Sequence, residues 1–139
     1  MERKLLQVLV VDDEPDMCWA LDNILRPVGY EVLTTTSGKE ALELVARESY
    51  AVVLVDAKLP DLDGLELAAL IRHQSPQTAM ILISGYFYQE DQTVTEGMQK
   101  DLFVGFVAKP FDLEQVRQMV RHAVDLSRKG FSAKGGINR

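Results

Sequence analysis

The sequence predicts an α/β protein in which a doubly wound, five-stranded parallel sheet carries helices on both faces, a (βα)5 arrangement. Three observations lead to this prediction. Short apolar runs recur five times along the chain, and helical patterns or turn residues separate them. These runs show little alternation between apolar and polar residues, which is typical of strands covered on both faces. Strands that alternate with helices form parallel sheets through helical crossovers.

The strands are predicted where each apolar run ends in charged or turn-forming residues. The most informative stretch is AVVLVDAKLPDLDG at residues 51–64, in which five apolar residues lead to Asp56 and Pro and Gly follow. Residues 31–35 are more polar, as expected near the edge of a sheet. The five predicted strands are residues 7–11, 31–35, 51–56, 80–83 and 103–108.

Four helices are well marked and a fifth is weak. The first begins at Pro15 and stops at Gly29, with an apolar stripe formed by Met17, Leu21, Ile24, Leu25 and Val28. Ser37 and Glu40 have the Ser-x-x-Glu spacing of a capping box at the start of the second. The third covers residues 65–72, and Asp112 caps the last, which ends at Leu126. Residues 86–100 predict only a loop and a short, poorly buried helix.

Composition narrows the class of protein. The chain has 139 residues, 47% of them hydrophobic, enough for one packed domain. Its net charge of −6 disfavours direct binding to nucleic acid, which requires Lys and Arg at the phosphates. The lone Cys18 allows no internal disulfide, and no apolar run resembles a signal peptide or a membrane span. A soluble, cytoplasmic protein without a membrane partner is expected.

Polar side chains follow four of the predicted strands and should meet at one edge of the sheet. They are Asp12, Asp13, Asp56, Ser84 and Lys109. Three carboxylates so close together repel one another, and hard oxygen ligands without His or Cys favour Mg²⁺ as the neutralising cation. Asp13 and Asp56 are expected to bind the metal directly, with Asp12 in support. Asp56 could then attack a phosphoryl group while the Lys109 ammonium and the Ser84 hydroxyl stabilise the transferred oxygens.

The motifs VLVVDDE, LVDAKLPDLDG, LISG and FVAKPF, in this order and spacing, resemble the receiver domain of two-component response regulators. The resemblance covers residues 7–126, which leaves residues 1–6 as an N-terminal extension. Residues 127–139 are rich in Gly, Ser and basic residues, and they are expected to be a flexible tail or the start of a linker. The same resemblance implies a phosphorylation-controlled switch without independent turnover.

The resemblance also assigns roles to single residues. It implies that Asp56 is the phosphoacceptor, that Asp12 and Asp13 are the acidic pair and that the main-chain carbonyl of Lys58 is a further metal ligand. Ser84 becomes the switch hydroxyl, Phe106 the aromatic switch residue and Lys109 the lysine before Pro110, a peptide bond that is commonly cis in the family. The implied partners are a histidine kinase or a histidine phosphotransfer protein. A homodimer through the surface formed by the fourth helix, fifth strand and fifth helix is also implied.

The sequence departs from the family pattern in two places. Ser84 and Gly85 stand where Thr and Ala are more usual, and the span from Ser84 to Lys109 is a few residues longer than typical. The fourth helix is therefore expected to be irregular. Phe106 lacks the hydroxyl of a Tyr, so its inward rotamer is expected to be populated before phosphorylation.

Other interpretations of the same residues remain open at this stage. A Mg²⁺-dependent phosphohydrolase with an aspartyl nucleophile is the main alternative, although such enzymes usually carry Asp-x-Asp at one strand end. A flavodoxin-like nucleotide-binding domain would need a glycine-rich loop after the first strand, where acidic residues stand instead. Among single residues, Cys18 and Trp19 are expected to pack on or beside the first helix, and His73 and His122 to be solvated. The triplet Tyr86-Phe87-Tyr88 either packs under the fourth helix or offers a contact surface.

Overall fold

The computed structural model of the protein describes residues 5–85 and 101–128. Five strands form one parallel sheet in the order β2-β1-β3-β4-β5. The strands are β1 (Gln7–Val11), β2 (Glu31–Thr35), β3 (Val52–Asp56), β4 (Ala79–Gly85) and β5 (Gly105–Lys109). The more polar strand β2 lies at the edge, as its composition predicted. This arrangement confirms the doubly wound parallel sheet.

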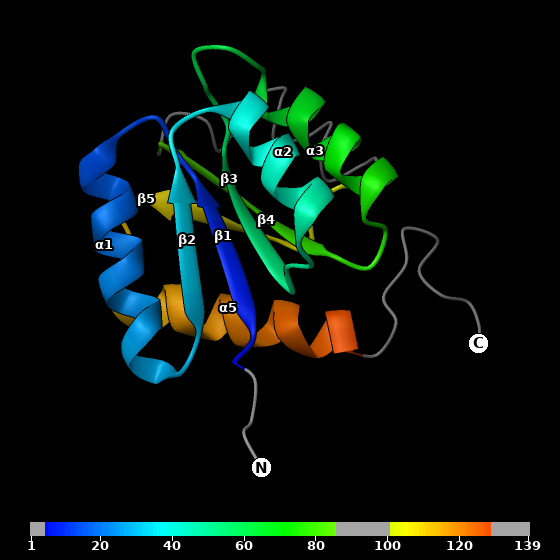
Figure 1. Cartoon of the computed structure of the whole chain (residues 1–139). Coiled ribbons are helices and arrows are strands. Elements are labelled where there is room, and N and C mark those ends of the chain that lie inside the picture. Colours follow the sequence, from blue (N-terminus) through cyan, green and yellow to red (C-terminus); the bar gives the residue numbers. More distant parts are fainter. Residues whose placement is uncertain (1–4, 86–100, 129–139) are drawn as a thin grey trace.

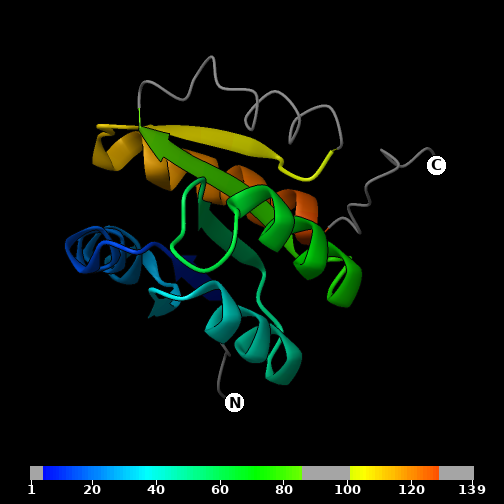
Figure 2. The same ribbon diagram turned by 90° about the horizontal axis from the view of Figure 1, so that it is seen from above.

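Helices cover both faces of the sheet. Figures 1 and 2 show α1 and α5 on one face and α2 and α3 on the other. The helices are α1 (Pro15–Leu25), α2 (Gly38–Arg47), α3 (Gly64–Gln74) and α5 (Leu113–Arg128). The fourth helix predicted within residues 86–100 and the triplet Tyr86-Phe87-Tyr88 lie outside the described residues. Residues 1–4 and 129–139 lie outside them as well.

The central strands are buried on both faces because their apolar residues alternate between two cores. In β1, Val8 and Val10 pack into the core under α1 and α5, whereas Leu9 and Val11 pack into the core under α2 and α3. This is the reason the runs lack the polar alternation of a half-exposed sheet. Every residue of β3 is buried, including Asp56.

The strand order places the loops of β1 and β3 next to each other at the C-terminal edge of the sheet. From β1 the chain first adds β2 on one side and then crosses back to add β3 on the other. Open α/β sheets bind their ligands at such a point, because the loops that follow the two neighbouring strands diverge there. The fold thus brings the strand ends that carry Asp12 and Asp56 together.

The first helix differs from the prediction at its end. α1 stops at Leu25, and a 3₁₀ turn at Arg26–Val28 leads to Gly29, which has a positive φ of 104°. The tighter turn rotates Val28 off the apolar stripe, and its side chain is 47% exposed. Trp19 is 69% exposed, contrary to the expected packing, because its neighbour Cys18 occupies the buried face of the helix.

Side chains cap the N-termini of α2 and α5. The Ser37 hydroxyl accepts a hydrogen bond from Glu40 N, as predicted, but Glu40 does not complete the capping box. Its carboxylate accepts a hydrogen bond from the Thr35 hydroxyl, whose oxygen in turn accepts one from Ser37 N. At α5 the cap is reciprocal: Gln115 N donates to Asp112 Oδ1 at 2.8 Å, and Asp112 N donates to Gln115 Oε1 at 3.1 Å.

The last strand and helix are shifted relative to their predicted limits. β5 begins at Gly105, two residues later than expected, although Phe103 is buried in the core under α2 and α3 and Val104 N already donates to the carbonyl of Met80 at 2.8 Å. α5 continues through Arg128, so the first two residues of the predicted tail are helical. The Ser127 hydroxyl there donates to the carbonyl of Gln77 at 3.2 Å.

Candidate functional site

Three carboxylates meet at the C-terminal edge of the sheet. Asp12, Asp13 and Asp56 each place an oxygen within 4.8 Å of the others, and Asp12 and Asp56 are buried while Asp13 is exposed. Main-chain donors orient the two buried groups: Glu14 N lies 2.9 Å from Asp12 Oδ1, and Lys58 N lies 3.3 Å from Asp56 Oδ1. The predicted convergence of these three carboxylates is therefore present.

Lys109 brings a positive charge to this site. Its Nζ lies 3.2 Å from Asp12 Oδ2, 3.3 Å from Glu14 Oε1 and 4.0 Å from Asp56 Oδ2. The contact with Asp12 is an ion pair without hydrogen-bond alignment. The Lys109–Pro110 peptide bond is cis, as the sequence resemblance suggested. Sequence reasoning had not assigned a partner role to Glu14, although the third acid of the Asp-Asp-Glu run was the available signal.

The buried carboxylates carry more negative charge than Lys109 neutralises. Burial, followed by the charge of Asp12, raises the pKa of Asp56 to about 7, although Lys109 and the Lys58 main chain act in the opposite direction. Burial also raises the pKa of Asp12. Burial alone would lower the pKa of Lys109, but the charges of Asp12 and Asp56 outweigh it and raise this pKa. The site favours an added cation or a proton.

The donor set fits a hard divalent cation. The cluster offers carboxylate oxygens alone, with no His or Cys among its members, and oxygen ligands suit Mg²⁺ better than Zn²⁺. The uncompensated charge on two buried carboxylates supplies the attraction. The part of the chain that the structure describes thus contains a carboxylate cluster whose oxygens suit a metal of this class.

Ser84 and Phe106 lie on one face of the sheet, on the neighbouring strands β4 and β5. Ser84 is fully buried in β4, and its Oγ has no hydrogen-bond partner among the described residues. The ladder pairs Leu82 with Phe106 and Ser84 with Ala108, so strand alternation places the Ser84 side chain on the same face as Phe106. Phe106 is half-buried against the core under α2 and α3. Ser84 and Phe106 are therefore diagonal neighbours on adjacent strands.

Comparison with known proteins decides the family. A model of the response regulator receiver domain matches residues 8–121. The chain belongs to this family. It is 35% identical over 120 residues to the response regulator protein PilR of Pseudomonas aeruginosa, a match that covers 86% of this chain and 26% of PilR. It is 28% identical to sporulation initiation phosphotransferase F of Bacillus subtilis over 86% of this chain and 94% of that protein.

Solved structures agree with the family. The receiver domain superposes with a TM-score of 0.83 on a CheY-like receiver domain protein from Methanospirillum hungatei, which is 25% identical, over 91% of this chain and 98% of that one. NtrX from Brucella abortus gives a TM-score of 0.84 at 28% identity, over 91% of this chain and 28% of that one. The chain spans about a quarter of the length of the first curated relatives it matches.

Membership places the chain among the regulatory domains of two-component systems. Receiver domains act in phosphorylation-controlled signalling, interact with histidine kinases and phosphotransfer proteins, and generally bind Mg²⁺ at an acidic pocket. Among the described helices, none is both long and apolar enough to pass through a bilayer.

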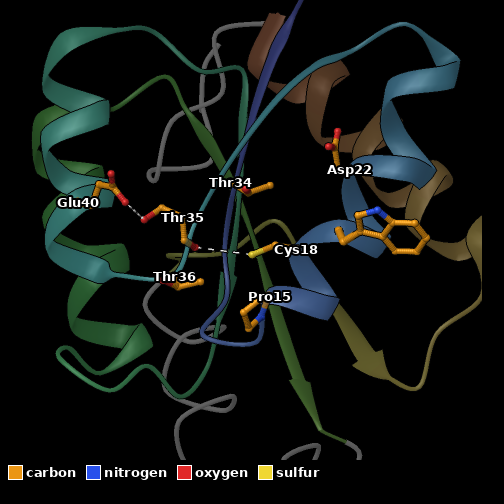
Figure 3. Close-up of a pocket in the computed structure, with 8 residues that line it drawn as sticks. Pro15, Cys18, Asp22, Thr34, Thr35, Thr36 and Glu40 are labelled. Carbon is orange, nitrogen blue, oxygen red and sulfur yellow. Dashed lines mark hydrogen bonds between the residues drawn. The ribbon is translucent and has the colours of Figure 1, made fainter.

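A separate pocket of about 390 Å³ adjoins the receiver site. It lies between α1 and the start of α2, across the end of β2 (Figure 3). The Cys18 thiol is buried beside this pocket, where it donates to the carbonyl oxygens of Asp12 at 3.3 Å and Thr35 at 3.8 Å.

Three single-residue predictions are confirmed. Cys18 is buried in the core, and the side chains of His73 and His122 are exposed.

The loop after Asp56 packs tightly against the strand that carries this residue. Gly64 N donates to the carbonyl of Ala57 at 3.2 Å, and Lys58 pairs with Asp63 as an isolated antiparallel bridge. A Cβ atom at Gly64 would lie 2.5 Å from the carbonyl oxygen of Asp56 and 2.9 Å from Ala57 Cα. This close approach of two main-chain segments leaves no room for a side chain at Gly64.

We predict that Gly64→Ala destabilises the receiver domain by about 1–3 kcal/mol, because main-chain atoms must move to admit the methyl group. Gly85→Ala is the matched control, since a Cβ there meets nothing within 4 Å. Urea unfolding monitored by circular dichroism measures both variants. Equal stability of the two would contradict the packing described for Gly64.

A second prediction concerns the pH dependence of stability without metal. An unfolded Asp has a pKa of about 3.9, whereas Asp56 in the fold has one of about 7, so folding takes up a proton between these values. The free energy of unfolding should therefore fall as the pH rises from about 4 to about 7.

The variant Asp56→Asn should weaken this fall and be more stable than the wild type at pH 7 by about 1–4 kcal/mol. Urea titrations in EDTA at several pH values provide the measurement. Asp63→Asn, at an exposed residue of the same loop, should keep the pH profile of the wild type. An identical profile for Asp56→Asn would show that burial of this carboxylate does not govern stability.

Proposed function

We propose that this receiver domain accepts a phosphoryl group on Asp56 from a phosphohistidine of a histidine kinase or a histidine phosphotransfer protein. The observation that carries the proposal is the position of Asp56, a buried carboxylate at a strand end with two further carboxylates and Lys109 around it. In the transfer, an oxygen of Asp56 forms a bond to phosphorus while the phosphorus–nitrogen bond of the donor breaks, and the imidazole leaves with the electron pair.

The charges around Asp56 control its reactivity. A nucleophile must be ionised, and the pKa of about 7 would leave much of Asp56 protonated at neutral pH. Cations near the carboxylate lower this pKa and restore the ionised form. Asp12, Asp13, Asp56 and the main-chain carbonyl of Lys58 are proposed to hold Mg²⁺. The bound ion would supply charge neutralisation and stabilise the oxygens of the phosphoryl group.

Lys109 is proposed to stabilise the product. Its ammonium group is closer to Asp12 and Glu14 than to Asp56, at 3.2 and 3.3 Å against 4.0 Å. A phosphoryl group on Asp56 would bring new anionic oxygens toward Nζ, and charge-assisted hydrogen bonds to them are stronger than neutral ones. The lysine would then exchange part of its interaction with Glu14 for one with the phosphoryl group.

The signal is proposed to leave the site through Ser84 and Phe106. The buried Ser84 hydroxyl lacks a hydrogen-bond partner among the described residues, so an acceptor on Asp56 would satisfy a group that is costly to leave unpaired. Movement of Ser84 toward the phosphoryl group would vacate space for Phe106, which is half-buried already. The surface that includes β5 and α5 would change and bind a partner or a second copy of the chain.

The domain is proposed to act as a switch that takes one phosphoryl group, in a cytoplasmic setting, without binding nucleic acid itself and without independent turnover. A Mg²⁺-dependent phosphohydrolase with Asp56 as nucleophile is the alternative from another class. Counting the phosphate released per chain separates the two, because a hydrolase turns over many times.

Acetyl phosphate with Mg²⁺ should add one phosphoryl group to the chain, because a small donor needs only the pocket itself. Intact-mass spectrometry measures the adduct. Asp56→Asn should abolish it, whereas Asp63→Asn should retain it, and EDTA should suppress it in the wild type. Undiminished labelling of Asp56→Asn would overturn the assignment.

Beryllofluoride, a mimic of the phosphoryl group, should shift NMR resonances in β4, β5 and α5 as well as in the loops of the carboxylates. Ser84→Ala should remove most of the shifts in β5 and α5 while Asp56 still accepts a phosphoryl group, because the variant lacks the linking hydroxyl. Full long-range shifts in Ser84→Ala would count against this route.

A further inference from the structure

Asp61, five residues after Asp56, makes an unusual set of contacts for an exposed side chain. Its Oδ1 accepts a hydrogen bond from Gly38 N at 3.0 Å, and its Oδ2 accepts one from Lys39 N at 3.0 Å and one from the Ser37 hydroxyl at 3.1 Å. The two main-chain bonds, from Lys39 first and Gly38 next, lower the pKa of Asp61. The β3–α3 loop is therefore attached to the N-terminus of α2.

Hydrogen bonds through Thr35 connect the N-terminus of α2 to the segment that carries Asp12. The Thr35 hydroxyl donates to the Glu40 carboxylate (Figure 3), and the Thr35 hydroxyl oxygen accepts a hydrogen bond from Ser37 N at 3.2 Å. The Thr35 carbonyl accepts a hydrogen bond from Asp12 N at 3.1 Å. A continuous chain of contacts thus joins the segment that carries Asp12 to the loop that follows Asp56.

Packing at the same place leaves the loop little freedom. A Cβ atom at Gly38 would lie 3.0 Å from Leu62 Cδ1 and 3.3 Å from Asp61 Oδ1, so the loop lies close over the first turn of α2. At the other end of the loop, Lys58 N donates to Asp56 Oδ1. Lys58 and Asp63 also form an isolated antiparallel β-bridge. The Asp61 contacts and the Lys58 contacts therefore restrain one short segment.

We propose that Asp61 is a positioning residue that holds the β3–α3 loop against α2 and so presets the main chain of Lys58 for the metal. The inference rests on the proposed function only in taking the Lys58 carbonyl as a ligand. Without Asp61 the loop would have to be ordered when the metal binds, and this entropic cost would weaken binding. The role differs from simple helix capping, because Ser37 already caps α2 through Glu40 N.

The test compares Asp61→Ala with Asp63→Ala in the full chain. Both changes remove one negative charge from the same loop, so an electrostatic effect on the cation is similar in the two. Mg²⁺ affinity is measured by isothermal titration calorimetry with magnesium chloride. Asp61→Ala should weaken binding about three- to tenfold relative to Asp63→Ala, less than the roughly 10- to 100-fold typical of a direct outer-shell partner.

Hydrogen exchange in EDTA gives a readout that does not depend on the metal. The amides of Lys58, Gly38 and Lys39 should exchange faster in Asp61→Ala than in the wild type. Asp61→Asn, which keeps one acceptor oxygen, should be intermediate in both exchange and Mg²⁺ affinity. Ser37→Ala removes the α2 cap and one of the three hydrogen bonds to Asp61, so it should lower the free energy of unfolding and weaken Mg²⁺ binding less than Asp61→Ala does.

The outcomes separate this inference from the proposed function. Equal Mg²⁺ affinity and equal loop exchange in Asp61→Ala and Asp63→Ala would overturn the role of Asp61, even if acetyl phosphate labels the wild type normally. Loss of Mg²⁺ affinity in Ser37→Ala as large as in Asp61→Ala would reduce the effect to helix capping and would also overturn it. Failure of the wild type to bind Mg²⁺ or to accept a phosphoryl group would count against the proposed function, while the exchange data would still test the loop contact.

Discussion

Burial of two carboxylates dominates the electrostatics of this receiver domain. Asp12 and Asp56 are both removed from water, and their pKa values rise because the charged forms lose hydration and, for Asp56, face a second negative charge. Lys109 offsets this only in part, since it also contacts Glu14. Burial of these two carboxylates lowers the stability of the fold. It also favours the binding of a cation at the site.

The rest of the fold supplies the rigidity that keeps these charges together. Two apolar cores fill the space above and below the sheet, so the strands that end at Asp12 and Asp56 have few ways to move apart. The loops are restrained by specific contacts, which include the Gly64 approach to the Asp56 carbonyl and the Asp61 bonds to α2. Close packing of the two cores and of the loops thus holds the buried carboxylates together. Such unfavourable local interactions are expected at functional sites.

Much of this architecture could be predicted from local patterns. Apolar runs without alternation, such as VVLV before Asp56, specify buried parallel strands because both faces must be covered. Carboxylates at the ends of two such runs then meet, because parallel strands end at the same edge. Limits of elements were less predictable: Phe103 has the composition of a strand residue, yet its side chain enters the core before its main chain joins the sheet.

The sequence by itself determined the fold class, the edge at which the polar residues meet and the family resemblance, because these depend on periodicity and on motifs that are continuous in the chain. Only the tertiary structure decided which partners the polar side chains take. Glu14 meets Lys109 across 95 residues, and Asp61 meets Gly38 across 23. Glu40 bonds Thr35 instead of completing the local capping box. Each of these contacts depends on how the loops of different strands are placed at one edge of the sheet. Separation along the chain does not reveal the distance between such loops in space.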